Sequence, residues 1–463
     1  MCSWGRFFLH IFVQLGTHLN FIKSPFKPGT SGDKRKQRRR IQMEKEKTKA
    51  RKQNMKIYSL YRAISLDLIF YYAIEFLFLT QVKEISAADI VLGQAFYAIF
   101  MIILQIPASV VIDKIGTRKC TILGNVFNCL FVILIMCCQN LGTLIFAQFI
   151  SALCFSLKDI SDKALIRYSI PETKKEGEIF SKLEGKAFKD YYLLNAITSI
   201  CSGFLYVINP YIPMIGALCF TLLAIFMSLG FKDIETEEDK QEPPKEYMKD
   251  LVQGIKFIMN SQRLRSLFLY GGIAWGIFCL IGTYRTSLLV DIGVPEQIIT
   301  IIAAIVGVAA AMGSKKQIQF HNHFRNKSLS IILLLTTFSI LIAGIMGIIN
   351  ISYEINLTMI ILCFAVINFV KGMSGVLTTR YLGNFADEKI LTQIFAVNAI
   401  SRNIFRAGIG FLGSYLLRIT NTANSMILVG IILLVTVLGL ISYMKTRLGL
   451  KPEEYGEKEI FEK

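Results

Sequence analysis

The sequence lacks the local patterns that mark most enzymes. It has no G-x-x-x-x-G-K phosphate-binding loop, because Phe180 stands where the first glycine before Gly185 and Lys186 would be needed. It also has no nucleophile elbow and no cluster of metal ligands, and we expect His321 and His323, in a predicted loop, to be solvated. These absences argue against an ATP-driven pump with its motor on this chain. We expect no enzymatic activity, no metal and no cofactor.

The cysteines lack any regular spacing. There are ten, and all except Cys2 fall in apolar segments. Neither a disulfide framework nor a metal site has this distribution. We therefore interpret them as small apolar side chains that fill space between helices.

Long runs without charge dominate what is present. The 463 residues are 53% hydrophobic, with a mean hydropathy of +0.50. A helix needs about 20 apolar residues to cross a hydrocarbon core roughly 30 Å thick. The sequence therefore predicts an all-α membrane protein with twelve transmembrane helices, at about 58–80, 89–112, 120–138, 142–166, 191–208, 211–231, 266–290, 297–312, 328–350, 356–379, 390–417 and 421–444.

The predicted connections alternate between those rich in basic residues and those with almost none. Most Lys and Arg fall at 113–119, 167–190, 232–265, 313–327 and 380–389, whereas connections such as 139–143 and 209–213 have almost none. Lys and Arg are enriched on the cytoplasmic side of membrane proteins. We therefore expect a multi-pass protein of the cytoplasmic membrane with both termini in the cytoplasm.

Much of the net charge of +18 is local. Residues 1–57 hold fifteen Lys or Arg and three Asp or Glu. We interpret this segment as a solvated cytoplasmic tail, with a polybasic lipid-binding tail as the alternative. Met43 and Met55 are both plausible starts, so part of residues 1–56 need not be native. Membrane lipid, and not nucleic acid, is the expected partner.

A weak internal repeat divides the chain in two. "KDISDKALIRY" at 158–168 aligns without a gap with "KGMSGVLTTRY" at 371–381, so that Lys158 matches Lys371 at an offset of 213 residues. "VKEISAADI" at 82–90 parallels "VDIGVPEQI" at 290–298 at an offset of 208. Parallel repeats are a transporter architecture, with the binding site between the repeats near the middle of the membrane. We expect six-helix halves at 57–231 and 266–446, a cytoplasmic linker at 232–265 and a tail at 447–463.

A motif after the second predicted span resembles the major facilitator superfamily. The family carries G-x-x-x-D-R-x-G-R-R/K there. In "SVVIDKIGTRK" at 109–119, Asp113, Gly116 and Arg118 match, while Ser109 and Thr117 depart. The resemblance implies a bacterial transporter of the 12-span type, with two six-helix halves related by a pseudo-two-fold axis along the membrane normal. It also implies a gating role for these three matching residues on the cytoplasmic side.

The resemblance implies which spans line the cavity. In this fold spans one, four, seven and ten line it, spans two, five, eight and eleven lie beside it, and the others face lipid. Charges inside a bilayer are costly and belong in a cavity. The four predicted lipid-facing spans have no Asp, Glu, Lys or Arg. The interior charges lie instead in spans one, four, seven, ten and eleven: Asp67, Glu75, the cluster of Lys158, Asp159, Asp162 and Lys163, Arg285, Lys371, Arg402 and Arg406.

Depth and spacing suggest roles for these residues. Asp67 and Lys371 lie near mid-membrane by residue count, and we expect Asp67 to carry a coupling proton, with a permanent ion pair as the alternative. Lys158 has Asp162 four residues on, which predicts a self-neutralised, structural pair, whereas Gly372 and Gly375 leave Lys371 without an acid in its own helix. Lys371 is therefore the main candidate for recognising substrate, and the wider set of binding candidates is Asp67, Lys371, Trp275, Arg402, Lys158 and Asp162. Trp275 lies at mid-depth opposite Asp67 by the 208 offset and is a candidate for stacking on substrate, with an ordinary packed indole as the alternative. Glu75 and Arg285 are candidates for an ion pair at an outer gate.

These observations predict a secondary transporter. We expect it to move a small solute by alternating access, driven by protons, as a monomer. The excess of positive charge among the interior residues favours an anionic or zwitterionic solute. The alternative is a membrane receptor or sensor that kept the fold and lost transport.

Overall fold

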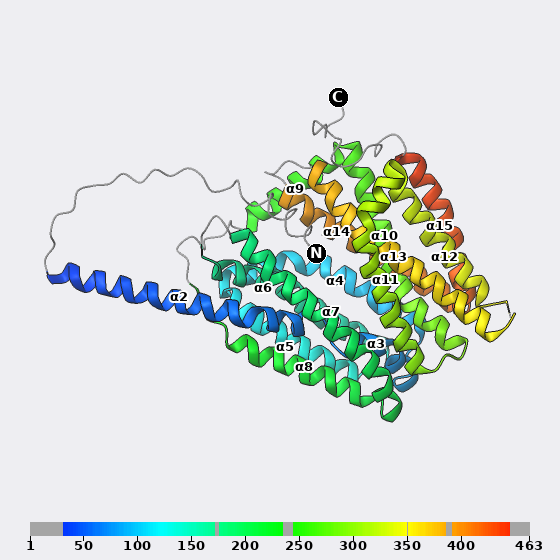
Figure 1. Ribbon diagram of the computed structural model, residues 1–463, viewed down its shortest axis with the longest axis horizontal. Coiled ribbons are helices and arrows are strands. Elements are labelled where there is room, and N and C mark those ends of the chain that lie inside the picture. Colours follow the sequence, from blue (N-terminus) through cyan, green and yellow to red (C-terminus); the bar gives the residue numbers. More distant parts are fainter. Residues whose placement is uncertain (1–30, 172–175, 235–243, 350, 386–390, 445–463) are drawn as a thin grey trace.

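The computed structural model describes residues 31–171, 176–234, 244–349, 351–385 and 391–444 (Figure 1). Within these ranges the regular structure is entirely helical. Ten helices there are long and apolar enough to cross a membrane, at positions where the sequence predicts spans. The expectation of an all-α membrane protein is confirmed.

The N-terminal half consists of seven α-helices and one π-helix among the described residues. A long first helix is followed, after a break, by two short pieces and then by five long helices. Ser86 caps α4 by accepting from the Asp89 N–H, and Asn140 and Thr143 form a reciprocal capping box on α6. The elements are α2 (Ser31–Ser65), α3 (Tyr71–Leu77), the π-helix η1 (Phe78–Val82), α4 (Ala87–Ile115), α5 (Thr117–Met136), α6 (Leu141–Ser169), α7 (Glu176–Ile208) and α8 (Tyr211–Leu229).

The C-terminal half follows a linker helix, α9 (Pro244–Met259). In this half the helix that corresponds to span seven is continuous over 30 residues, and Ser261 caps its start. The elements are α10 (Gln262–Asp291), α11 (Glu296–Phe324), η2 (Arg325–Lys327), α12 (Ser328–Met346), α13 (Tyr353–Phe385), α14 (Leu391–Ile419) and α15 (Thr422–Met444).

The first predicted span is broken at residues 66–70. α2 ends at Ser65 and α3 begins at Tyr71, with Phe70 at φ 70° between them. The Asp67 side chain accepts a hydrogen bond from the N–H of the next residue, Leu68, at 3.0 Å. Such local side-chain acceptors compete with helical hydrogen bonding. Neither piece is therefore a long apolar helix, although the sequence predicts one continuous span over 58–80.

Two helices extend beyond the predicted spans. α11 continues to Phe324, through a segment where the sequence predicts a connection, and α7 begins at Glu176 instead of near 191. Hydropathy reports where apolar side chains end and not where helical hydrogen bonding ends, so polar extensions of a helix are missed. Span eleven corresponds to α14, which carries Arg402, Arg406 and Arg418 along its length.

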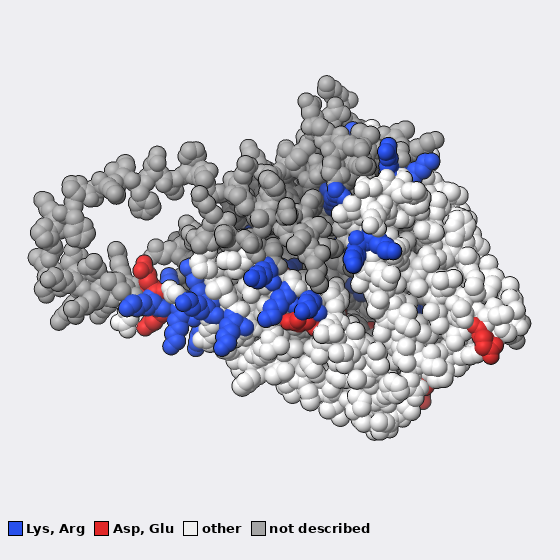
Figure 2. Space-filling model, viewed as in Figure 1, with Lys and Arg blue, Asp and Glu red and all other residues white. Residues whose placement is uncertain are grey.

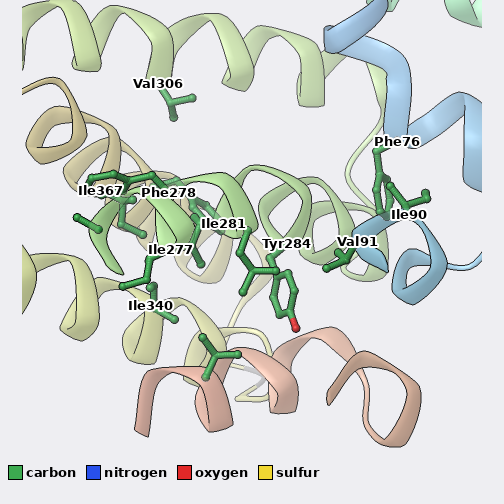
Figure 3. Packing of buried hydrophobic residues seen from close by; sticks show 14 of the residues in the cluster. Phe76, Ile90, Val91, Ile277, Phe278, Ile281, Tyr284, Val306, Ile340 and Ile367 are labelled. Carbon is green, nitrogen blue, oxygen red and sulfur yellow. The ribbon is translucent and has the colours of Figure 1, made fainter. Parts of the chain in front are cut away.

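The halves meet along two helix pairs, α4 with α14 and α7 with α11. We call the end with the connections 83–86, 209–210, 292–295 and 420–421 the short-loop end, and the opposite end the basic end. Toward the short-loop end, Phe76, Ile90 and Val91 of the N-terminal half join the apolar cluster that contains Ile281 and Tyr284 of α10 (Figure 3). The hydrophobic core is thus continuous across the seam there.

Charge is distributed unevenly over the surface. In the view of Figure 2, Lys and Arg gather along α2 and at the basic end, whereas the flanks of the bundle are almost wholly uncharged. The flanks expose large apolar side chains such as Phe226 and Val435. An apolar belt of this kind suits lipid and not water.

Candidate functional site

A polar pocket lies between three helices of the C-terminal half. It encloses about 250 Å³ of empty space, part of it open to solvent. α13 contributes Lys371, Ser374 and Thr378, α10 contributes Trp275, and α14 contributes Arg402, among other lining residues. The structure therefore brings together Lys371, Trp275 and Arg402, three of the residues that the sequence suggests for substrate binding. We call this space the lysine pocket.

Arg402 and Trp275 form one wall of the lysine pocket. The centre of the guanidinium lies 4.0 Å from the centre of an indole ring, which is a cation–π contact. This stacking holds the planar guanidinium in place while leaving its N–H groups free to point elsewhere. On α13, the hydroxyl of Ser374 lies 2.9 Å from that of Tyr270 on α10, which fixes the polar side of the pocket.

Two glycines of α13 differ in how closely they are packed. A Cβ on Gly372 would lie 2.0 Å from the Ala310 carbonyl oxygen, so this residue permits close packing against α11. A Cβ on Gly375 would meet nothing within 4 Å, and Gly375 lines the lysine pocket. The first glycine therefore allows close approach of α13 and α11, and the second leaves room beside Lys371.

A second pocket lies at the seam between the halves. It has about 220 Å³ of empty space, part of it open to solvent, and Arg406 and Cys279 line it together with Gln94 of α4. Arg406 and Cys279 each follow a residue of the lysine pocket, Arg402 and Trp275, by four positions on the same helix. The guanidinium of Arg406 lies 4.8 Å from the ring centre of Tyr97, across the seam. We call this space the seam pocket.

The cations of these pockets have no acidic partner among the described residues. Lys371, Arg402 and Arg406 form no ion pair there, although Glu75 lies near enough to Arg406 for their charges to interact. Arg285, which lines neither pocket, forms no ion pair among the described residues either. The Nε atoms of the three arginines are buried without a hydrogen-bond partner in the same part of the chain. Buried cations are costly without a partner, so this arrangement favours an anionic ligand.

Asp67 lies within the break of span one. Besides the Leu68 N–H, its carboxylate accepts the hydroxyl of Tyr191 on α7 at 3.3 Å. The side chain is half-buried. No ion pair joins it to Lys371 or Arg402 in the described structure, so the alternative of a permanent ion pair is not formed here.

Lys158 and Asp162 do not pair with each other. The Lys158 ammonium donates to the Ser65 carbonyl at 2.5 Å, at the end of α2. Asp162 instead pairs with Arg62 at 3.0 Å, and both side chains are almost fully buried. The expected self-neutralised pair on α6 is therefore corrected: both residues hold span one, Lys158 through a backbone carbonyl and Asp162 through an arginine.

Further hydroxyl groups complete the surroundings of Asp162. Tyr61 and Thr121 donate to the same carboxylate oxygen at 3.1 and 3.0 Å, and Asn125 donates to Tyr61. Arg62 is not among the site residues predicted from sequence, even though it lies inside the predicted span 58–80. Its charge at an interior position was the signal that could have identified it.

The expected outer pair of Glu75 and Arg285 is not formed in this structure. Glu75 accepts the hydroxyl of Tyr71 at 3.1 Å. The ion pair between the halves at the short-loop end joins Arg418 to Asp89 at 2.5 Å. Three hydrogen bonds also cross toward this end: Thr283 to Gln94, Ser414 to the Ala88 carbonyl and Gln81 to Glu296.

The motif after span two forms the turn between α4 and α5. Gly116 has φ 90°, a conformation that favours glycine. Arg118 pairs with Asp233 at 3.2 Å and also donates to the Leu229 carbonyl, so it ties α5 to the end of α8 at the basic end. Asp113 lies in the last turn of α4, and its side chain is outside the described part of the structure.

Known proteins match this chain in family and fold. The profile of the Major Facilitator Superfamily matches residues 63–404. A crystal structure of the nucleoside transporter NupG has a TM-score of 0.64 at 8% identity, covering 86% of this chain and 99% of that one. No curated protein matches the chain in sequence.

Two further structures extend the likeness. A bacterial homolog of the human lysosomal transporter Spinster, inward-facing and unoccupied, has a TM-score of 0.62 at 12% identity, covering 87% of this chain and 98% of that one. A POT family transporter in complex with 5-aminolevulinic acid has a TM-score of 0.56 at 14% identity, covering 86% and 96%. At these identities the likeness shows the fold alone.

Proposed function

We propose that this chain, which belongs to the Major Facilitator Superfamily, is a secondary active transporter that moves a small anionic or zwitterionic solute by alternating access. Membrane transport follows from the family, while the solute class and its coupling are our inference. The observation that carries the proposal is the lysine pocket, where Lys371 and Arg402 lie without an acidic partner among the described residues.

The contacts between the halves support alternating access. The ion pair of Arg418 with Asp89 and the three crossing hydrogen bonds lie toward the short-loop end. These polar contacts are few and partly exposed, and exposed ion pairs contribute only about 0–1 kcal/mol. Breaking them would cost little, so opening of this end depends mainly on separating the apolar side chains of Phe76, Ile90 and Val91 from α10.

We further propose that protons drive transport through Asp67. A carboxylate that accepts from Leu68 and Tyr191 loses acceptor capacity when it is protonated. Because the first of these bonds lies inside the break of span one, protonation would change the backbone hydrogen bonding that joins α2 to α3. This links the charge of one side chain to the geometry of a cavity-lining helix.

Solute-dependent proton movement tests the proposal. Protein in liposomes that contain a pH-sensitive dye would be given a proton gradient and a panel of small anions and zwitterions. We expect at least one solute to accelerate proton entry, and Asp67→Asn to abolish that acceleration while solute exchange continues. Glu354→Gln removes an exposed acid from the first turn of α13 and should leave both readouts unchanged.

Two results would contradict the proposal. If Asp67→Asn retains solute-driven proton entry, Asp67 does not carry the proton. If solutes bind and none crosses the membrane, the receptor alternative is correct.

A further inference from the structure

The lysine pocket and the seam pocket are neighbours along the same two helices. α10 contributes Trp275 to the first and Cys279 to the second, while α14 contributes Arg402 and then Arg406. Four residues along a helix correspond to about one turn, or roughly 5.4 Å. Two positively charged positions are therefore set one helical turn apart.

We propose that the substrate is a short dicarboxylate that spans both pockets. This inference rests on the proposed transport function and names the solute for it. One carboxylate lies between Lys371 and Arg402, and the other meets Arg406 at the seam. Arginine suits both positions because its fixed N–H groups match a carboxylate.

The balance of charge favours two anionic groups over a zwitterion. The interior of the C-terminal half holds four cations, Lys371, Arg402, Arg406 and Arg285, whereas the first predicted span supplies two carboxylates, Asp67 and Glu75. Both carboxylates already accept a tyrosine hydroxyl, from Tyr191 and Tyr71 respectively. An ammonium group of a zwitterion would add to the positive excess, whereas a dianion would balance it.

The position proposed for the second carboxylate, at Arg406, also suits a transported solute. Arg406 lies over Tyr97 of α4, so this arginine is in contact with the opposite half. The affinity for a ligand that binds both Arg402, within the C-terminal half, and Arg406, at the seam, therefore depends on whether the halves are closed together. A monocarboxylate would fill only one of the two pockets.

Trp275 provides a direct reporter of binding. The chain has two tryptophans, Trp4 and Trp275. In a Trp4→Phe background, purified full-length protein would be titrated with glutarate, its monomethyl ester, 5-aminovalerate and inorganic phosphate while indole fluorescence is followed. We expect glutarate to bind at least about 10-fold more tightly than its monomethyl ester, because charge-assisted contacts have this effect.

Variants locate each carboxylate. Arg406→Gln should remove the preference for glutarate over its monomethyl ester, while the ester still binds and so shows that the protein is folded. Lys371→Gln and Arg402→Gln should weaken both ligands, on the order of 10- to 100-fold. Arg325→Gln, which removes an exposed arginine at the basic end, should change neither affinity.

Several outcomes would overturn the inference. Equal or tighter binding of the monomethyl ester or of 5-aminovalerate would exclude a dicarboxylate, and an unchanged preference in Arg406→Gln would exclude the seam pocket. Tighter binding of phosphate than of glutarate would indicate that the site binds a single dianionic group instead of two separate carboxylates. Failure here leaves proton-driven transport of another solute intact, whereas tight glutarate binding without flux would leave the binding site intact and contradict transport.

Discussion

The ammonium of Lys158 donates to the carbonyl of Ser65 at 2.5 Å, where the first half of span one ends. Carbonyl groups at the end of a helix lack helical partners and attract cations. The neighbouring helix makes room for this contact, since a Cβ on Gly124 would lie 2.6 Å from the Lys158 side chain. In the second half of the chain α10 is unbroken, and Lys371 lines a pocket instead.

Lys158→Met should therefore destabilise the protein while Lys371→Met should not. Loss of the donor leaves a buried carbonyl unsatisfied, which costs about 1–3 kcal/mol. Thermal unfolding in detergent would compare the two variants. A larger loss of stability in Lys371→Met would contradict the structural assignment of Lys158.

Disruption of the Arg62–Asp162 pair should lower stability more than Lys158→Met does. Asp162→Ala strands a buried arginine, and removal of one partner of a buried ion pair costs about 3–5 kcal/mol. The double variant Arg62→Met/Asp162→Leu should regain much of that stability, because no buried charge is left unpaired. Thermal unfolding and the yield of monodisperse protein would report the difference. A double variant no more stable than Asp162→Ala would argue against the pair.

Gly410→Leu should open the short-loop end. A Cβ at Gly410 would already lie 2.9 Å from the Cβ of Ala95 across the seam, and overpacking costs about 1–3 kcal/mol. With Cys279 as the sole cysteine, a charged thiol reagent added from the short-loop side should label the seam pocket faster in this variant. Gly408→Leu is the matched control, since nothing lies within 4 Å of its Cβ position. Equal labelling of the two variants would contradict the prediction.

The Arg418–Asp89 pair should also favour closure of the short-loop end, but more weakly than the close packing at Gly410 does. Asp89→Arg places two like charges opposite each other and should raise labelling of Cys279 from the short-loop side. The exchanged variant Asp89→Arg/Arg418→Asp should restore the original rate, because the pair forms again in reverse. The effect should be several-fold at most, as expected for an exposed pair. No rescue by the exchange would show that the contact does not seal this end.

The helical membrane fold could be predicted from the sequence because apolar runs record burial in lipid directly. That Lys371 and Arg402 line a common polar space could also be expected, because charged side chains inside a membrane bundle are costly and therefore tend to face a polar cavity; their role as a binding site stays a prediction. The break in span one could not be predicted, since "SLDLIF" at 65–70 contains neither proline nor glycine. The break depends on tertiary contacts, from Lys158 to Ser65 and from Ser202 to the Phe70 carbonyl.

The choice of partner for each charged side chain was the least predictable feature. Spacing within one helix suggests Lys158 with Asp162, but a carboxylate in a bundle can reach arginines on other helices, and Arg62 lies closer. The partner of Arg418 is likewise a residue 329 positions away, Asp89. Such choices are made by the packing of helices, which one sequence does not record.

α2 continues without interruption from outside the bundle into span one (Figure 1). Its inner part is fixed to the N-terminal half through Arg62 and through Asn54, which bonds Ser169 and the Lys232 carbonyl. The projecting turns must therefore tilt whenever that half tilts. A spectroscopic label or a helical fusion partner joined to this projection would act as a pointer, converting a small rotation within the membrane into a displacement large enough to follow in single molecules.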